Sequence, residues 1–208
     1  MGDASDSGTL SGIRLATGRD AGQVAAIYAP NVTGKIISFE SEPPGADEMR
    51  RRIEATLERY PWLVCERRGR VLGYAYAGPH GSRAAYQWSV DVSVYVHGES
   101  HRMGVGRALY ASLFAALALQ GFYNAYAGAT LPNPASVGLH ESVGFRPVGI
   151  YHEVGYKLGA WHDVGWWHLP LREKITAPDP PTHLPSVLDS VEWETALATG
   201  LPLLRNDP

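Results

Sequence analysis

One long stretch of the chain spaces its hydrophobic residues as one face of an α-helix does, at every third or fourth position. In residues 105–120, Leu109, Leu113 and Leu117 form an apolar stripe, and Gly121 follows as a stop signal. This is the clearest helix that the pattern predicts. The other predicted helices are residues 20–28, residues 47–60 (with Met49, Ile53 and Leu57 repeating every four positions) and residues 134–143.

Other stretches alternate apolar and polar residues or are short and rich in β-branched residues, which is typical of strands. Residues 62–67 and 71–78 predict a hairpin that turns at Gly69, and residues 86–96 are the longest strand candidate. Further extended segments are predicted at residues 13–16, 35–39, 122–129, 145–156 and 164–171. Because helices and strands alternate, we expect a mixed α/β (α+β) fold around a central, partly antiparallel sheet.

The two ends of the chain differ in composition from its middle. Residues 1–12 are rich in Gly, Ser, Asp and Thr, which predicts a disordered leader. Four prolines at positions 178, 180, 181 and 185 interrupt regular structure near the other end, where a short helix over 187–198 remains compatible with the pattern. We therefore expect one domain over residues 13–171 and a proline-rich tail over 172–208, packed on the domain or trailing from it.

Composition narrows the function classes further. The 208 residues carry a net charge of −3 without a basic stripe, which disfavours nucleic acid as a partner. The chain contains no run of 18 apolar residues, so we expect no membrane span. The N-terminal residues do not resemble a secretory signal, and we therefore expect a cytoplasmic protein. Because Cys65 is the single cysteine, we expect no internal disulfide framework and no multi-cysteine zinc site. The sequence also lacks a His-Glu-x-x-His motif, so we expect no metal site.

The sharpest chemical feature is the junction between the strand at 86–96 and the helix at 105–120. Valines at 90, 92, 94 and 96 share one face of the strand, and Asp91, Ser93 and Tyr95 share the other. Gly104 and Gly106 lie in the following loop, where backbone N–H groups of a helix start favour an anion. The chain lacks Gly-Lys-Ser/Thr, and Leu109 stands where a dinucleotide fingerprint needs its third glycine. The junction alone is equally compatible with a phosphate cradle and with a simple tight turn.

A second element, Asn133 with Ser136 followed by Leu139, Gly144 and Phe145, completes a longer pattern. Together with the glycines at 104 and 106, it resembles the GNAT acetyltransferase superfamily. Longer stretches are similar to the phosphinothricin N-acetyltransferase family within it. These are residues 38–43, 59–64, 74–79, 85–88, 94–96 and 155–165, which together span nearly all of residues 13–171.

The resemblance implies a GNAT fold with splayed middle strands, acetyl-CoA as cosubstrate and the primary amine of a small amino acid as acceptor. It implies that the pantetheine arm lies between strands 90–97 and 122–130, beside Tyr95 and Val96. It further implies that the loop binds the pyrophosphate through His101, Arg102, Met103, Gly104, Val105, Gly106 and Arg107, and that Asn133 and Ser136 complete the cofactor wall.

Acetyl transfer needs a group that deprotonates the amine and a donor that protonates the departing thiolate. We assign the first role to Asp91, where the family carries a glutamate, so that the shorter side chain acts through water or shares the role with His140. His140 stands at the position of the superfamily's tyrosine acid, and Tyr110 is the second candidate acid. Each residue also has a purely structural alternative. Asp91 can be a hydrogen-bonded carboxylate at a strand end, His140 a helix residue that only packs, and Tyr110 a core residue.

For the acceptor pocket the candidates are Phe39, Arg83 and Tyr86, because an arginine can pair bidentately with a carboxylate or phosphinate. Each has an alternative: Arg83 as an exposed loop residue, and the two aromatic rings as core. Cys65 lies in an apolar strand, which argues against an acyl-cysteine route.

Three functions remain on this evidence. The first is acetylation of phosphinothricin-like amino acids, and the second is acetylation of methionine sulfoximine, its sulfone or another amine. The third is a non-catalytic acetyl-CoA sensor, which the Asp91 and His101 departures alone support. We also expect a homodimer, with residues 165–168 (Gly-Trp-Trp-His) as a candidate seam because clustered tryptophans favour interfaces.

Overall fold

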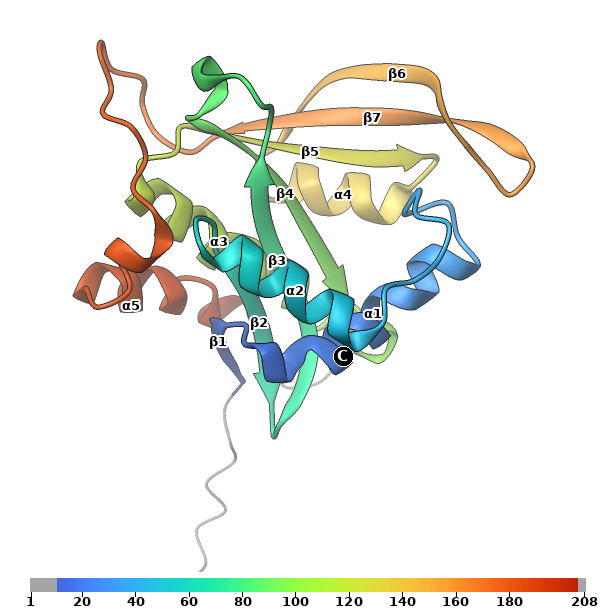
Figure 1. The fold of residues 1–208 in the computed structure, drawn as a ribbon, viewed down its shortest axis with the longest axis horizontal. Coiled ribbons are helices and arrows are strands. Elements are labelled where there is room, and N and C mark those ends of the chain that lie inside the picture. The colour runs from blue at the N-terminus through green and yellow to red at the C-terminus, as the bar shows by residue number, and fades with distance from the viewer. Residues whose placement is uncertain (1–10, 206–208) are drawn as a thin grey trace, which may run out of the picture.

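A computed structural model describes residues 11–205 and shows a twisted sheet with helices on both faces (Figure 1). The strands are β1 (Gly12–Leu15), β2 (Trp62–Arg67), β3 (Arg70–Pro79), β4 (Ser89–Val96), β5 (Asn124–Leu131), β6 (Arg146–Lys157) and β7 (Ala160–Pro170). The helices are α1 (Ala21–Thr33), α2 (Ala46–Leu57), α3 (Val105–Gln120), α4 (Pro134–Ser142) and α5 (Val191–Ala198). In the part of the chain that the structure describes, no helix combines the length and the apolar character needed to cross a membrane.

The strands run in the order β1-β2-β3-β4-β5-β7-β6, and β4 and β5 are its parallel pair. These two strands pair only from Ser89 opposite Asn124 to Asp91 opposite Tyr126, and then separate. In Figure 1, β3 and β4 run from top to bottom, whereas β5 and β7 run across the view. The predicted mixed sheet with splayed middle strands is confirmed.

Each face of the sheet carries its own hydrophobic core. On one face α3 places Leu109, Leu113 and Leu117 against the valines of β4, so that the apolar stripe of the sequence faces the sheet. On the other face, α1 and α2 pack over a row of stacked aromatic rings formed by Trp62, Tyr74, Tyr76 and Tyr95. The sheet is therefore buried on both faces around β4, where the two strands separate.

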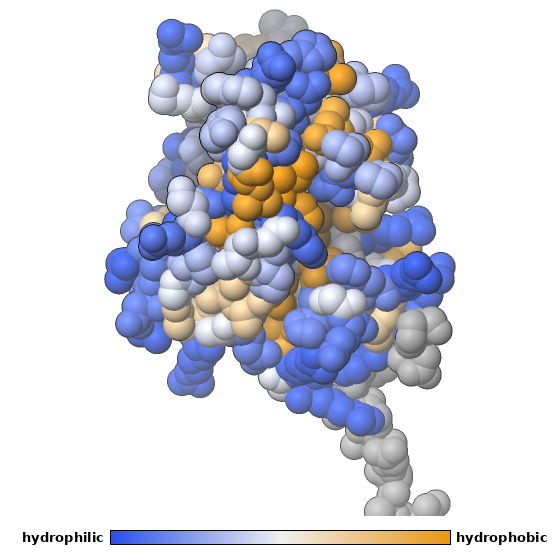
Figure 2. All heavy atoms as spheres, turned by 90° about the vertical axis from the view of Figure 1, so that its right-hand side faces the viewer, coloured by the Kyte–Doolittle hydropathy of each residue, from blue (hydrophilic) through white to orange (hydrophobic). Residues whose placement is uncertain are grey.

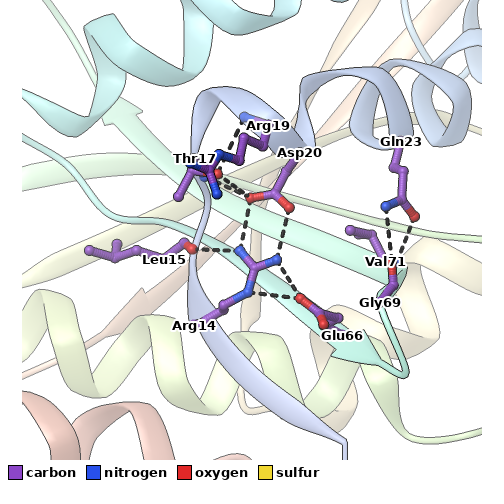
Figure 3. A network of polar contacts seen from close by, with 9 residues as sticks. All are labelled: Arg14, Leu15, Thr17, Arg19, Asp20, Gln23, Glu66, Gly69 and Val71. Carbon is purple, nitrogen blue, oxygen red and sulfur yellow. Dashed lines mark hydrogen bonds and ion pairs between the residues drawn. The ribbon is translucent and has the colours of Figure 1, made fainter.

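Arg14 fastens the first strand to the rest of the fold (Figure 3). Its guanidinium donates to both carboxylate oxygens of Asp20 at 2.8 Å and also binds Glu66 of β2. Burial opposes ionisation of Asp20, but the hydrogen bonds from Arg14 and Thr17 outweigh it and lower the pKa of that carboxyl. Asp20 and Thr17 also form a capping box just before α1, so Arg14 and Asp20 together join β1, β2 and the start of a helix.

The segment after β7 returns along α3. Gln120 donates to the carbonyl oxygens of Arg59 and Thr182, both at 2.9 Å, and Leu184 and Trp193 are buried in the core on that face. Ser112 of α3 donates to the carbonyl of Leu197 at 2.7 Å. Residues 182–197 thus pack against the helix.

The chain then reaches the loop before α3. Gly200 N–H donates to Ser112 Oγ at 3.1 Å, and Arg205 N–H donates to the carbonyl of Met103 at 3.0 Å. A Cβ on Gly104 would lie 2.0 Å from the carbonyl oxygen of Leu203. The last described residues therefore support the glycine loop from outside.

Several sequence-based boundaries move in the structure. Residues 35–39 form no strand, because the carbonyl of Ser38 accepts from a lysine instead of a neighbouring strand. A 3-10 turn occupies Ala84–Tyr86, so β4 begins at Ser89, and α5 begins at Val191 because Ser190 caps it. Of the predicted leader, residues 1–10 lie outside the described part, whereas Gly12 belongs to β1 and pairs with Glu66.

Residues 165–168, the candidate dimer seam, are buried or half-buried in the single chain. Trp167 is only 6% exposed and packs beside His140, and Gly165 is also buried. The exposed apolar side chains lie instead mainly along β6 and at the hairpin tip, because β6 is the edge strand of the sheet and nearly all of its residues are exposed. They are Val148, Ile150, Tyr151, Val154, Tyr156, Leu158 and Trp161.

Candidate active site

A small cavity opens where β4 and β5 separate. Its lining combines side chains from both faces of the sheet: Ile37, Val92, Ser93, Val94, Tyr95, Tyr110, Gly128, Ala129, Asn133, Ser136 and His140. Strands that no longer pair leave backbone N–H and C=O groups free for a ligand. The cavity therefore occupies the place where the resemblance puts the pantetheine arm.

Tyr110 and His140 meet at the wall of this cavity. The phenolic oxygen lies 2.9 Å from His140 Nε2, and Ser136 Oγ lies 3.3 Å from Nδ1 on the other side of the ring. Burial lowers the pKa of His140 to about 4 and raises that of Tyr110 well above its usual value. Near neutral pH the imidazole is uncharged and the phenol keeps its proton.

The predicted phosphate loop has the geometry of an anion site at a helix start. Gly104 has φ of +78° and stands at the cap of α3, a conformation that favours glycine. Ala108 N–H makes the first helical bond to Gly104, so the N–H groups of residues 105–107 lack helical partners. A Cβ on Gly106 would lie 3.1 Å from the Leu139 side chain, so this glycine lets α3 approach α4.

The side chains of the loop divide into two groups. His101, Arg102 and Arg107 are exposed around the helix start, where they add positive charge. Met103 and Val105 are buried in the core, so only their backbone can reach a ligand. Beyond the loop, Asn133 caps α4 by accepting from Ser136 N–H at 3.1 Å. Asn133 and Ser136 of this cap also line the cavity.

Asp91 lies outside the cavity lining, directly before Val92, and its carboxylate binds His80 Nδ1 at 2.7 Å. Burial raises the pKa of Asp91, and the hydrogen bond from His80 opposes that rise. Sequence reasoning missed His80. The signal would have been the register between β3 and β4, which the sequence analysis did not predict: His80 directly follows β3, and Gly78 of β3 pairs with Asp91.

The three acceptor candidates do not gather in one pocket. Tyr86 lies with its ring 6.1 Å from His80, and Arg83 is an exposed residue of the same turn, whose carbonyl accepts from Tyr86 N–H. Phe39 lies apart, against Gly155 of β6 and 6.4 Å from the His162 ring. None of the three lines the cavity, whereas Ile37, which the sequence did not single out, does.

A wider groove adjoins the cavity at the tip of the β6–β7 hairpin. Its lining shares Ile37 and Asn133 with the cavity and adds Gly34, Lys35, Ile36, Thr130, Pro132, Pro134, Ala135 and Leu158. Figure 2 views the molecule from this side and shows hydrophobic surface in its middle. The groove gives the cavity an apolar approach.

Lys157 holds the segment between α1 and α2 at this groove. Its ammonium donates to the carbonyl oxygens of Val32 and Ser38, each at 2.6 Å, and to that of Glu40 at 3.0 Å. From the other side, Tyr28 binds both Ser38 and Glu40. The segment that carries Ile37 and Phe39 is thus fastened on two sides.

Comparison with known proteins identifies the family to which the chain belongs. Residues 13–166 match the acetyltransferase (GNAT) domain family. A phosphinothricin N-acetyltransferase of Streptomyces viridochromogenes is 42% identical over 155 residues, which cover 74% of this chain and 85% of that protein. An L-methionine sulfoximine/L-methionine sulfone acetyltransferase of Salmonella typhimurium is 34% identical over 168 residues, covering 80% and 98% respectively.

Comparison with a solved structure identifies the same family from the three-dimensional fold. The crystal structure of a GNAT superfamily phosphinothricin acetyltransferase from Sinorhizobium meliloti, in complex with acetyl-CoA, superposes with a TM-score of 0.77. It is 32% identical and covers 85% of this chain and 97% of its own. The splayed strands, the glycine loop and these relatives together show that the chain belongs to the GNAT acetyltransferases and is an acetyl-CoA-dependent N-acetyltransferase.

Proposed function

We propose that the protein transfers the acetyl group of acetyl-CoA to the primary amine of phosphinothricin-like amino acids. The observation that carries this proposal is the Tyr110–His140 pair at the wall of the cavity between the splayed strands. Relatives at 37–42% identity that are phosphinothricin N-acetyltransferases support the acceptor class.

The residues present fit acetyl-CoA. Tyr95, Asn133 and Ser136 line the cavity that we propose for the pantetheine arm, and Val96 directly follows Tyr95 on β4. The N–H groups at the start of α3, with the exposed Arg102 and Arg107, offer a cradle for its pyrophosphate. The bound cosubstrate supplies an activated acetyl thioester, and the protein provides position and proton transfer.

Tyr110 and His140 serve the thiolate side of the reaction. In the tautomer protonated on Nε2, His140 donates to the Tyr110 oxygen, and the phenolic O–H is free to turn into the cavity. Tyr110 then gives its proton to the departing thiolate. Asp91 serves the amine side, where the ammonium proton must leave before nitrogen attacks. Arg83 and Tyr86, on the turn beside it, and Phe39 are the proposed acceptor contacts.

A second acceptor class has specific support. The Salmonella relative that acetylates methionine sulfoximine and sulfone covers 80% of this chain, and these compounds resemble phosphinothricin in shape. Both acceptor classes present an anionic or strongly polar group for Arg83. The alternative therefore changes the acceptor and keeps the chemistry.

We also propose that the protein is a cytoplasmic homodimer and that its activity confers resistance to the herbicide phosphinothricin. The exposed apolar row on β6, from Val148 to Tyr156, supports an interface between copies because water-exposed apolar patches favour association. Light scattering after size exclusion tests this directly. A mass of 22.6 kDa at micromolar concentration contradicts the dimer.

The decisive experiment measures thiol release from acetyl-CoA with a thiol-reactive dye. Phosphinothricin, methionine sulfoximine, methionine sulfone and the ordinary amino acids are compared at one enzyme concentration. We expect fast release with one of the first three. If calorimetry shows that acetyl-CoA binds while none of the amines releases thiol, the acceptor proposal is wrong and the sensor alternative gains support.

A further inference from the structure

His80 and Asp91 meet because of the register between β3 and β4. Gly78 pairs with Asp91 in the antiparallel ladder, and His80 N–H reaches the carbonyl of Ser89 two residues before Asp91. The two side chains are therefore diagonal neighbours on one face of the sheet. Nδ1 of His80 and Oδ1 of Asp91 lie 2.7 Å apart.

Aromatic rings fix the orientation of the imidazole. The His80 ring stacks on Tyr126 with centroids 4.1 Å apart and planes 15° apart, and Tyr86 and Trp166 meet it edge to face. With Nδ1 held by Asp91, no residue in the described range 11–205 forms a hydrogen bond with Nε2. The side chain is 28% exposed, so the ring is not sealed in the core.

The Asp91 side chain is 39% exposed, more than that of His80, but its carboxylate is the less suitable base. Its Oδ1 is engaged by His80, and an aspartate ends one methylene earlier than the glutamate that the resemblance places at this position. Histidine is also the side chain that most often serves as a general base. The ring stands on the same turn region as Arg83 and Tyr86, the proposed acceptor contacts.

We propose that His80 is the general base of this enzyme and that Asp91 is its positioning residue. This inference rests on the proposed function and names the proton acceptor within it. The N–H bond of the acceptor ammonium breaks, its electron pair stays on nitrogen, and the proton forms a new bond to His80 Nε2. Asp91 keeps the other ring proton on Nδ1 and stabilises the imidazolium, which later releases its proton to water. The freed amine attacks the thioester carbon, and as the C–S bond breaks the thiolate takes the proton of Tyr110. The second proton of the attacking nitrogen leaves to water, and Tyr110 regains a proton from water.

The first test compares two matched variants. In His80→Asn the amide can still donate to Asp91 but cannot accept a proton, and in Asp91→Asn the ring loses its orienting anion. We expect kcat/KM for the amino acid to fall about 10²–10⁴-fold in His80→Asn, with KM for acetyl-CoA unchanged. The double variant should be about as slow as the slower single variant, because residues that act as a unit are not additive.

The pH profile separates a base from a structural histidine. The titratable groups around the ring are Asp91, Tyr86 and Tyr126, and Asp91 is the charged one among them. We expect the acidic limb of kcat/KM to disappear in His80→Asn and added imidazole to restore part of the rate. The control is His152→Asn, which alters a second histidine–aspartate pair, His152 with Asp163, on the exposed hairpin. It should change the rate less than twofold.

A spectroscopic readout does not depend on turnover. Imidazole ¹⁵N shifts, assigned by the signals lost in His80→Asn, should show Nδ1 protonated in the wild type and a changed tautomer in Asp91→Asn. If His80→Asn keeps a rate within threefold and the same acidic limb, His80 is not the base although the proposed function stands. If the wild type acetylates none of the amines, the proposed function and the base role both fail, and the ¹⁵N shifts report on the pair alone.

Discussion

The phenolic oxygen of Tyr110 on α3 lies 2.9 Å from Nε2 of His140 on α4, and both side chains are almost fully buried. The two residues are separated by 30 positions and meet because Gly106 and Leu139 allow their helices to approach. The pair places a protonated phenol at the one point where the two parallel strands part.

Removing the phenolic hydroxyl tests its role as the proton donor. We expect Tyr110→Phe to lower kcat about 10–100-fold while KM for acetyl-CoA changes less than twofold, since the loss affects the departing thiolate and not binding. Steady-state kinetics with thiol detection measures both constants. Tyr123→Phe is the control, because Tyr123 is also a core tyrosine. An unchanged kcat in Tyr110→Phe would exclude it as the acid.

The lowered pKa of His140 makes stability depend on pH. The pKa is about 4 in the folded protein and about 6.5 in the unfolded chain, so between these values the unfolded state binds more protons. The stability is therefore complete above pH 6.5 and is lost as the pH falls through 4, by about 3 kcal/mol for this group. Urea unfolding at pH 7 and 4.5 should show a smaller loss in His140→Gln than in the wild type. Equal losses contradict a depressed pKa.

The contact between the C-terminal segment and the glycine loop predicts an effect on cofactor binding. A Cβ on Gly200 would lie 2.0 Å from the carbonyl oxygen of Ala108, so Gly200→Ala must displace the segment that reaches Met103 and Gly104. We expect KM for acetyl-CoA to rise several-fold with kcat within twofold, and the free energy of unfolding to fall by about 1–3 kcal/mol. Gly22→Ala on α1, where no atom lies within 4 Å, is the control. Loss of stability with unchanged KM would show that the segment does not support the loop.

Replacing Lys157 should affect the KM for the amino acid rather than the KM for acetyl-CoA. Lys157→Met leaves the carbonyl oxygens of Val32 in α1 and of Ser38 and Glu40 after it without their donor. Ile37 then loses its fixed position at the groove. We expect KM for the amino acid to rise about tenfold while KM for acetyl-CoA stays within twofold. Lys174→Met, at an exposed position, serves as the control. Equal changes in both KM values would mean that the variant disturbs the whole site.

The sequence predicted well those features that depend on near neighbours in the chain. The predicted helix at residues 105–120 coincides with α3, because leucines four positions apart meet on one face and Gly121 adopts the left-handed conformation that ends it. The glycine loop was predictable for the same reason. Tyr110 and His140 were found through family resemblance, and the structure supplies their contact.

Pairs far apart in the chain were decided by the tertiary structure alone. His80 reaches Asp91 through strand register, Lys157 reaches Ser38 across 119 positions, and Arg205 reaches Met103 after the chain has passed along α3. Periodicity specifies which face of an element is apolar, whereas the meeting of two polar side chains depends on register, twist and close approach, to which many distant residues contribute. The amino-acid sequence by itself thus determined the elements, the loop and the family, and only the folded chain decided which groups face one another at the site.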